Sequence, residues 1–155
     1  MPALKSIRLR TVVVGPVMAL ALLGAGCGKD EKADYRDKVD KADKKFENEL
    51  NDAGAKMRAA GQSKDRQQYS DGAKQLQTAV SEFNSTLEDL KEPEDAKEEE
   101  QALIDALKRF SDTVGRINAA VQSDDEKAIR AEIATLQPQA QAVQSAGDAL
   151  ENAVE

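Results

Sequence analysis

The sequence predicts an all-α protein, an antiparallel up-down-up-down four-helix bundle that follows a short N-terminal leader. Four long segments each carry a row of apolar side chains three or four positions apart, here called an apolar stripe, which is the spacing of one helix face. Alanine, glutamine, aspartate, glutamate and lysine dominate the composition, as they do in long helices. Only a few residues separate the segments, and short connections favour antiparallel neighbours.

We expect the first helix over residues 34–60. Its apolar stripe consists of Tyr35, Val39, Ala42, Phe46, Leu50, Ala53, Met57 and Ala60. The opposite face carries acid–base pairs four residues apart with the acid first, the more stabilising order. These pairs are Asp34–Lys38, Asp37–Lys41 and Asp40–Lys44. Gly61 is expected to end this helix and Ser63 to cap the next, because glycine and serine favour those positions.

We expect the second helix over residues 64–90. Its apolar stripe consists of Tyr69, Ala73, Leu76, Val80, Phe83, Leu87 and Leu90. Pro93 fits the first turn of a third helix, where its missing N–H is not needed. Acidic residues then fill the early turns of that helix, near the positive end of its dipole, and we interpret them as a solvated face. They are Glu94, Asp95, Glu98, Glu99 and Glu100.

The third and fourth helices are expected over residues 94–121 and 124–154. The third stripe consists of Leu103, Leu107, Phe110, Val114, Ile117 and Val121, and the fourth of Ile129, Ile133, Leu136, Ala140, Val143, Gly147, Leu150 and Val154. Ser123 and Glu126 form a capping box before the fourth stripe. Pro138 lies inside the fourth helix and should kink it, or split it near Leu136 or Gln137.

The near-heptad spacing of the stripes predicts how the helices pack. It favours crossing angles of about 20° and left-handed, coiled-coil-like packing. A dimer of two helical hairpins is the main structural alternative. The sequence does not predict the oligomeric state.

The N-terminal leader has the pattern of an export signal. Lys5, Arg8 and Arg10 precede an apolar run over residues 12–23, which is followed by the small residues 24–26 and by Cys27, the only cysteine. The run is shorter than the ~20 residues that a membrane-spanning helix needs. We therefore expect residues 1–26 to be a cleaved signal peptide.

The segment Leu23-Gly24-Ala25-Gly26-Cys27 resembles the bacterial lipobox, in which an apolar residue and two small residues precede a lipid-modified cysteine. The lipobox usually has leucine three places before the cysteine, where this chain has Gly24. The resemblance implies that a diacylglyceryl group joins the Cys27 sulfur, that cleavage follows Gly26, and that this lipid binds the membrane. Residues 27–33 would then be the lipidated cysteine and a short tether, and residues 34–155 the bundle. Ordinary signal cleavage, with Cys27 left as an unpaired thiol, is the alternative.

The lipid would also fix the orientation of the bundle. If the first helix starts at the lipid, the connection at residues 91–95 and the C-terminus lie at the membrane end. The turns near Gly61 and Ser123 then lie at the far end.

The charge of the mature chain limits its partners. Removal of residues 1–26 takes away three basic side chains and no acidic one, so 22 basic residues become 19 against 29 acidic, and the net charge changes from −7 to −10. This charge argues against nucleic acid, which needs a basic patch. It also argues against electrostatic binding to anionic lipid, so the anchor has to be the lipid on Cys27.

The sequence lacks the residues that most catalytic and metal sites need. It has no histidine and one cysteine, which excludes the usual di-iron, zinc and copper sites and the nucleophile–histidine pairs. The acidic run over residues 92–100 lacks the spacing of a Ca²⁺-binding loop. All five aromatic residues lie on the stripes, as core residues do. We predict no catalytic residue, cofactor or metal ligand.

The sequence therefore predicts a non-enzymatic lipoprotein, anchored on the extracytoplasmic side of a bacterial membrane, with a structural or protein-interaction role in the cell envelope. The alternative is an extracytoplasmic binding protein, such as a small envelope chaperone, stress sensor or inhibitor, that uses one helical face. An exposed apolar patch would favour the alternative. Ile104, which lies beside Leu103 and outside the stripe, is a candidate for such a patch.

Overall fold

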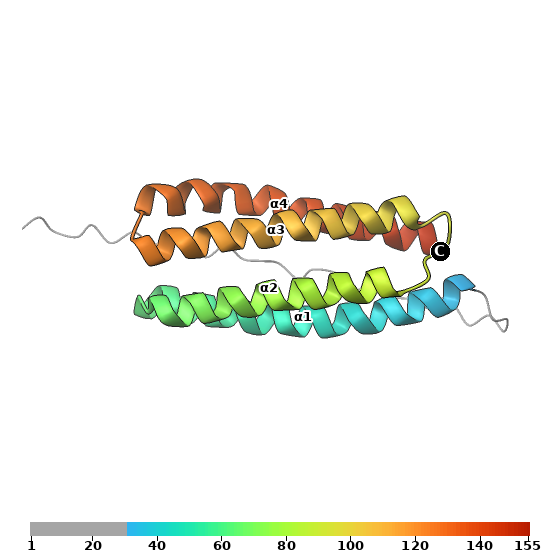
Figure 1. Cartoon of the computed structure of the whole chain (residues 1–155), viewed down its shortest axis with the longest axis horizontal. Coiled ribbons are helices and arrows are strands. Elements are labelled where there is room, and N and C mark those ends of the chain that lie inside the picture. The colour runs from blue at the N-terminus through green and yellow to red at the C-terminus, as the bar shows by residue number, and fades with distance from the viewer. Residues whose placement is uncertain (1–30) are drawn as a thin grey trace, which may run out of the picture.

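A computed structural model of the chain describes residues 31–155, which form four α-helices and, within that range, no strand (Figure 1). The helices are α1 (Glu31–Ser63), α2 (Arg66–Asp89), α3 (Lys97–Ser123) and α4 (Glu126–Val154). The predicted all-α fold class is confirmed for this part of the chain. The predicted signal peptide, Cys27 and residues 28–30 lie outside the described residues.

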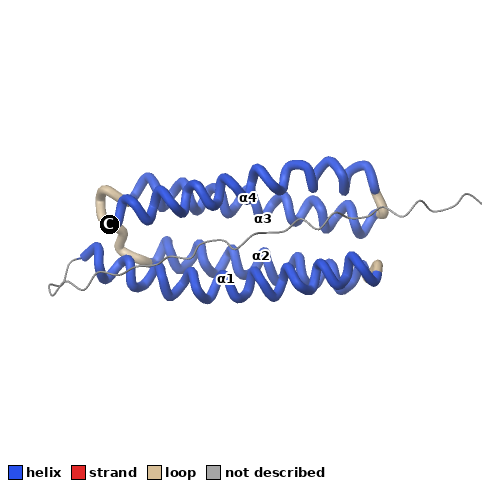
Figure 2. The backbone as a smooth tube through the Cα atoms, turned by 180° about the vertical axis from the view of Figure 1, so that it is seen from behind, coloured by secondary structure: helices blue, strands red, loops and turns tan. Residues whose placement is uncertain are grey.

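The helices form an elongated bundle of two pairs, α1 with α2 and α3 with α4, and the pairs are joined along α2 and α3 (Figure 1). The two short turns lie at one end, here called the turn end (Figure 2). The start of α1, the α2–α3 connection and the C-terminus lie at the other, here called the closed end. There the Lys32 ammonium donates to the Asp95 carboxylate at 2.6 Å and to the Ala153 carbonyl at 3.1 Å. These bonds tie α1 to both the α2–α3 connection and the end of α4.

The core consists of apolar side chains from all four helices. Its larger buried members are Tyr35, Phe46, Leu76, Val80, Phe83, Leu87, Leu103, Ile104, Leu107, Phe110, Val114, Leu150 and Val154. The rings of Phe46 and Phe83 stack with their centroids 4.9 Å apart, which joins α1 to α2. Full burial of each large apolar side chain contributes about 1.5–3 kcal/mol.

Ile104 belongs to this core and is only 2% exposed, so the predicted exposed patch at this residue is wrong. The reason is that α3 packs against both α2 and α4. A helix between two neighbours buries a wider face than one stripe, and Ile104 and Ala106 lie on that wider face.

Two aspartates cap the helices that follow the short turns. The Asp65 carboxylate accepts a hydrogen bond from the backbone N–H of Gln68, and the Asp125 carboxylate accepts one from the backbone N–H of Ala128, both at 2.9 Å. Aspartate is among the best N-cap residues, and these bonds satisfy donors that the helix itself leaves free. As a result α2 and α4 each begin two residues after their predicted starts.

The predicted serine caps are wrong. Ser63 and Ser123 are the last residues of α1 and α3, and their hydroxyls donate to backbone carbonyls four residues back at 3.0 and 3.1 Å. Both helices continue past their predicted ends because the capping aspartates come two residues later. The predicted helix end at Gly61 is wrong for the same reason, since the left-handed residue that follows α1 is Lys64, with a φ of 59°.

The ends of the predicted tether and of the third helix also differ. Residues 31–33, predicted as tether, form the first turn of α1, where Glu31 stands at the positive end of the helix dipole. The third helix begins at Lys97 rather than at residue 94. The Pro93 carbonyl accepts a hydrogen bond from the Ala96 N–H at 2.9 Å, which holds residues 94–96 in a turn.

α4 continues through Pro138 without a break, so the predicted split is wrong, and a change of helix direction there stays a prediction. Proline has no N–H to donate to the carbonyl four residues back. That carbonyl belongs to Ala134, and both Ala134 and Pro138 are exposed, so water can satisfy it.

Candidate functional site

The side of the bundle between α1 and α4 is open over most of its length. α2 and α3 are joined along their whole length by the contacts Glu88–Lys108 at 3.5 Å, Gln77–Ser111 at 3.5 Å and Arg66–Asp124 at 2.6 Å. Among the described residues, the hydrogen bonds between α1 and α4 lie at the closed end. We call the facing sides of α1 and α4 the seam.

The seam leaves much of the α4 stripe uncovered. Near the closed end Gly147, Leu150 and Val154 are buried. Toward the turn end the rest of the stripe is half-buried, namely Ile129, Ile133, Leu136, Ala140 and Val143. Leu136, Ala140 and Val143 pack against the edge of the core, and the two isoleucines lie beyond it. The seam is therefore a strip of incompletely covered apolar surface along α4.

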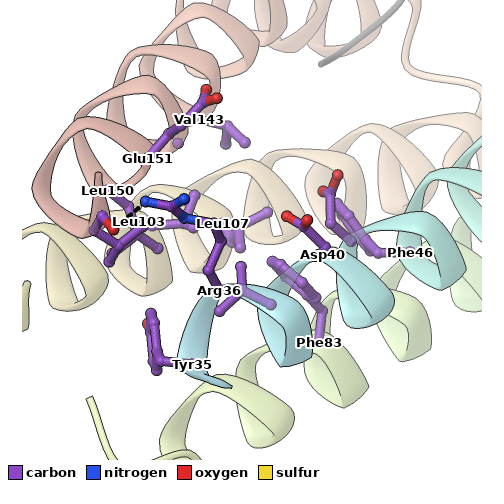
Figure 3. Close-up of a pocket in the computed structure, with 14 residues that line it drawn as sticks. Tyr35, Arg36, Asp40, Phe46, Phe83, Leu103, Leu107, Val143, Leu150 and Glu151 are labelled. Carbon is purple, nitrogen blue, oxygen red and sulfur yellow. Dashed lines mark hydrogen bonds between the residues drawn. The ribbon is translucent and has the colours of Figure 1, made fainter. Parts of the chain in front are cut away.

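A small cavity of about 50 Å³ opens at the closed-end half of the seam (Figure 3). Its floor is apolar and comes from all four helices, with Phe46, Phe83, Leu103, Leu107, Val143 and Leu150 among the lining residues. Ligand pockets for metabolites and drugs have volumes of about 300–1,000 Å³. This cavity therefore has the size of a single side chain.

Charged side chains from both helices surround the mouth of this cavity. They are Arg36, Asp40 and Asp43 on α1 and Glu151 on α4. Figure 3 shows Arg36 extending from α1 toward α4, with Asp40 farther along α1 and Glu151 on the opposite helix. An apolar floor with a charged rim is suited to a ligand that is itself amphipathic.

Asp43 is the most unusual of these groups because its side chain is largely buried and its carboxylate has no hydrogen-bond or ion-pair partner among the described residues. It is 8% exposed, and within residues 31–155 the structure gives it no hydrogen bond or ion pair. Burial, and then the nearby Glu47 and Asp40 carboxylates, raise its pKa from 3.8 to about 6, while Lys44 acts in the opposite direction. At neutral pH the fold therefore holds an ionised carboxylate that is poorly solvated and has no direct ion pair, which destabilises the free protein.

Arg36 and Glu151 face each other across the seam. The Arg36 guanidinium donates to the Val154 carbonyl, and its Nε is buried without a hydrogen-bond partner. Partial burial, followed by repulsion from Glu155, Asp148 and Asp40, raises the pKa of Glu151, and Arg36 opposes this rise. One guanidinium thus faces an excess of carboxylates at the cavity mouth, and the site has a negative field.

A buried hydrogen bond lies at the closed end beside this cavity. The Tyr35 hydroxyl donates to the Glu100 carboxylate, and both residues are buried, at 2% and 7% exposed. Burial raises the pKa of both groups, and for Glu100 this outweighs the lowering by the Tyr35 hydrogen bond. The prediction of a solvated Glu100 is wrong, because the first turns of α1 cover the start of α3. The bond is a structural link between these helices.

The second hollow lies between α2 and α3 and has a volume of about 290 Å³. Its lining is mainly polar and includes Gln77, Ser81, Asn84, Ser85, Glu88, Lys108 and Ser111. The Asn84 Oδ1 atom is buried there without a hydrogen-bond partner. The hollow has neither an aromatic platform nor an excess of charge, and we assign it no ligand.

The acids that the sequence groups over residues 92–100 do not meet in one site. Asp95 binds Lys32, Glu92 binds Lys97 at 3.5 Å, and Glu100 binds Tyr35. Across the part of the chain that the structure describes, no group of three or more His, Cys, Asp or Glu side chains is arranged to hold a metal ion. In that same part, no helix has the length and apolarity required to cross a membrane.

Comparison with protein-family models, curated proteins and solved structures found no match for this chain. Its function therefore has to be argued from its own residues. The predicted lipidation site, Cys27, lies outside the described residues, and the seam is the feature that sequence reasoning missed. The sequence carries a weak signal for the seam, which is the charge of Asp43 next to Ala42 on the apolar stripe.

Proposed function

We propose that this protein is a non-enzymatic lipoprotein of the bacterial cell envelope, held on the extracytoplasmic side of a membrane by lipid on Cys27, and that it binds a protein partner along the seam. The export signal and the lipobox-like segment support the anchor. The observation that carries the binding role is the half-exposed α4 stripe.

The exposed stripe favours binding over a purely structural role. A self-contained spacer gains stability by closing its bundle, whereas this fold leaves Ile129, Ile133 and Leu136 only partly covered. Covering the remaining surface of each such side chain contributes roughly 0.5–1 kcal/mol at about 25 cal/mol per Å². The stripe as a whole therefore offers a partner several kcal/mol, and the surrounding charges keep it soluble in the free state.

We infer that the bundle has the up-down-up-down, antiparallel topology and left-handed packing expected from the stripes. Two contacts between α1 and α2 support the topology, Lys45–Glu82 and Lys56–Gln75. The residue numbers rise along α1 and fall along α2, as they do in antiparallel helices. The near-heptad spacing supports the handedness.

The anchor then gives the seam an orientation. Glu31, the first residue of α1, follows Cys27 by four positions, so the closed end would lie at the membrane. A helix of 33 residues extends about 50 Å, at 1.5 Å per residue. The exposed part of the seam would thus point away from the membrane, where envelope proteins can reach it.

Crosslinking in the native membrane tests this proposal. The tagged full-length protein is crosslinked briefly, purified and analysed by mass spectrometry for both Cys27 lipid and bound protein. The variant Ile133→Glu places a charge in the seam, and Ala134→Glu places the same charge on the exposed side of α4 as a control.

We expect lipidated Cys27 and a stoichiometric partner that Ile133→Glu loses and Ala134→Glu retains. Equal retention by both variants would overturn the binding role of the seam. An unlipidated Cys27 would overturn the anchor, and with it the orientation of the bundle.

A further inference from the structure

The largely buried side chain of Asp43 identifies the kind of group that the seam accepts. This side chain lines the apolar cavity, is 8% exposed and lacks a partner within the described residues. A cation on an apolar stem satisfies both parts of the site, because the stem covers the floor and the head binds the carboxylate. Lysine and arginine side chains have this construction. Their hydrogen bonds to carboxylates are about twice as strong as neutral ones.

The size of the cavity indicates a side chain rather than a free molecule. Its volume of about 50 Å³ is far below that of a metabolite pocket. A metal ion is also a poor occupant, since residues 31–155 hold no group of three or more ligands of the required types. The cation therefore belongs to a larger partner that covers the rest of the seam.

The negative charge around the seam disfavours a second copy of this chain as the occupant. Asp40, Asp43 and Glu47 follow one another along α1, and Glu151 lies across from them. These four carboxylates outnumber the two nearby positive charges, the Arg36 guanidinium and the Lys44 ammonium. Another copy would bring the same acids, and the mature chain has a net charge of −10. A basic partner is complementary to this field.

The uncovered α4 stripe has the length and spacing of a helix-binding face. From Ile129 to Val143 the half-buried side chains span 15 residues, or about 21 Å. Four turns of an amphipathic helix cover this distance with anchors three or four residues apart. An added strand would need an open sheet edge, and the described part of the chain has no strand.

We propose that the seam binds a basic amphipathic helix of a partner protein. The apolar face of this helix lies on the α4 stripe, and one lysine or arginine enters the cavity, with its cationic head among Asp40, Asp43 and Glu151. This inference rests on the proposed function and adds the chemistry of the partner to it.

Binding of designed peptides to the full-length lipidated protein tests the inference. The protein is held in phosphatidylcholine nanodiscs, and empty nanodiscs supply the reference signal. Three labelled 18-residue peptides are compared: a Lys/Leu amphipathic helix, its Gln/Leu counterpart without charge, and a Lys/Ser peptide of equal charge without an apolar face. The protein variants are Asp40→Asn/Asp43→Asn in the seam and Asp71→Asn/Asp105→Asn on exposed faces of α2 and α3. Both double variants lose two negative charges.

We expect the Lys/Leu helix to bind at least tenfold more tightly than either other peptide. The seam variant should weaken this binding at least tenfold, and the matched variant should weaken it less than twofold. Equal losses in the two variants would show a general charge effect and would overturn the inference. Equal binding of the Lys/Ser peptide would overturn it too.

The outcomes also separate this inference from the proposed function. If a native partner depends on Ile133 but the protein prefers the Gln/Leu helix, the seam is a binding site and the basic-helix inference fails. If Ile133→Glu does not affect partner retention, the proposed function fails first. If the protein self-associates and Ile133→Glu abolishes this association, a second copy is the occupant of the seam, and the inference is overturned.

Discussion

α3 and α4 have similar apolar stripes but very different surroundings. The α3 stripe is buried from Leu103 to Ile117, because α2 covers one side of it and α4 the other. The α4 stripe has α3 as its main neighbour and is fully buried only near the closed end. The spacing of apolar residues thus defines which face of a helix is apolar, but the number of neighbouring helices decides whether that face is covered. The uncovered stripe is where binding energy remains available.

The largest expected effect is the difference between matched leucine truncations on these two helices. Leu107→Ala on α3 removes a side chain that is 1% exposed and should lower the free energy of unfolding by about 2–5 kcal/mol. Leu136→Ala on α4 removes a half-buried side chain beside open space, and we expect a loss of about 1 kcal/mol or less. Urea unfolding followed by circular dichroism measures both values. Similar losses would mean that the seam is closed in solution.

The next effect is a gain in stability on neutralising Asp43. The folded-state pKa of about 6 exceeds the ordinary value of 3.8, so the native state binds more protons between these values. Stability therefore falls as pH rises through this interval. Asp43→Asn should raise the free energy of unfolding by about 1–3 kcal/mol at pH 7.5 and have little effect at pH 4.

The matched variant for this measurement is Asp37→Asn, which removes an exposed carboxylate from the same helix. It should change stability by less than about 0.5 kcal/mol at either pH. A loss of stability in Asp43→Asn at pH 7.5 would show that the carboxylate has a partner in the free protein. That result would remove the main support for a cation site in the cavity.

Tyr35→Phe tests the closed end, where α1 does meet its neighbours. The change removes the hydrogen bond to the buried Glu100 carboxylate and leaves that acceptor unsatisfied, at a cost of about 1–2 kcal/mol. A double-mutant cycle with Glu100→Gln separates this bond from the loss of packing. A coupling free energy near zero would mean that apolar contacts alone hold the closed end together.

The sequence predicted some of these features and not others, for physical reasons. The four helices followed from the stripes, because an amphipathic segment has few other ways to cover its apolar face. The seam did not follow, since Leu107 and Leu136 occupy equivalent places in their stripes and differ only in what lies opposite. Glu100 was interpreted as part of a solvated face, and Asp43 was given no role. Only the packing of α1 against its neighbours buries these two side chains. The caps at Asp65 and Asp125 were missed because serines just before them fit the same pattern.

The smallest expected effect on stability is the loss of either of those two caps. The two variants should differ in which part of the bundle exchanges its amide hydrogens faster. Asp65→Ala and Asp125→Ala each remove one carboxylate–N–H bond, with a loss of about 0.5–1 kcal/mol. The first turns of α2 are joined to α3, for example by the Arg66–Asp124 pair, whereas the first half of α4 lies along the open seam. Asp125→Ala should therefore speed hydrogen exchange mainly over residues 126–136, while Asp65→Ala should shift protection throughout the bundle. Uniform changes in both variants would show that the start of α4 unfolds only with the whole protein, and that the contrast between α3 and α4 lies in surface exposure and not in local stability.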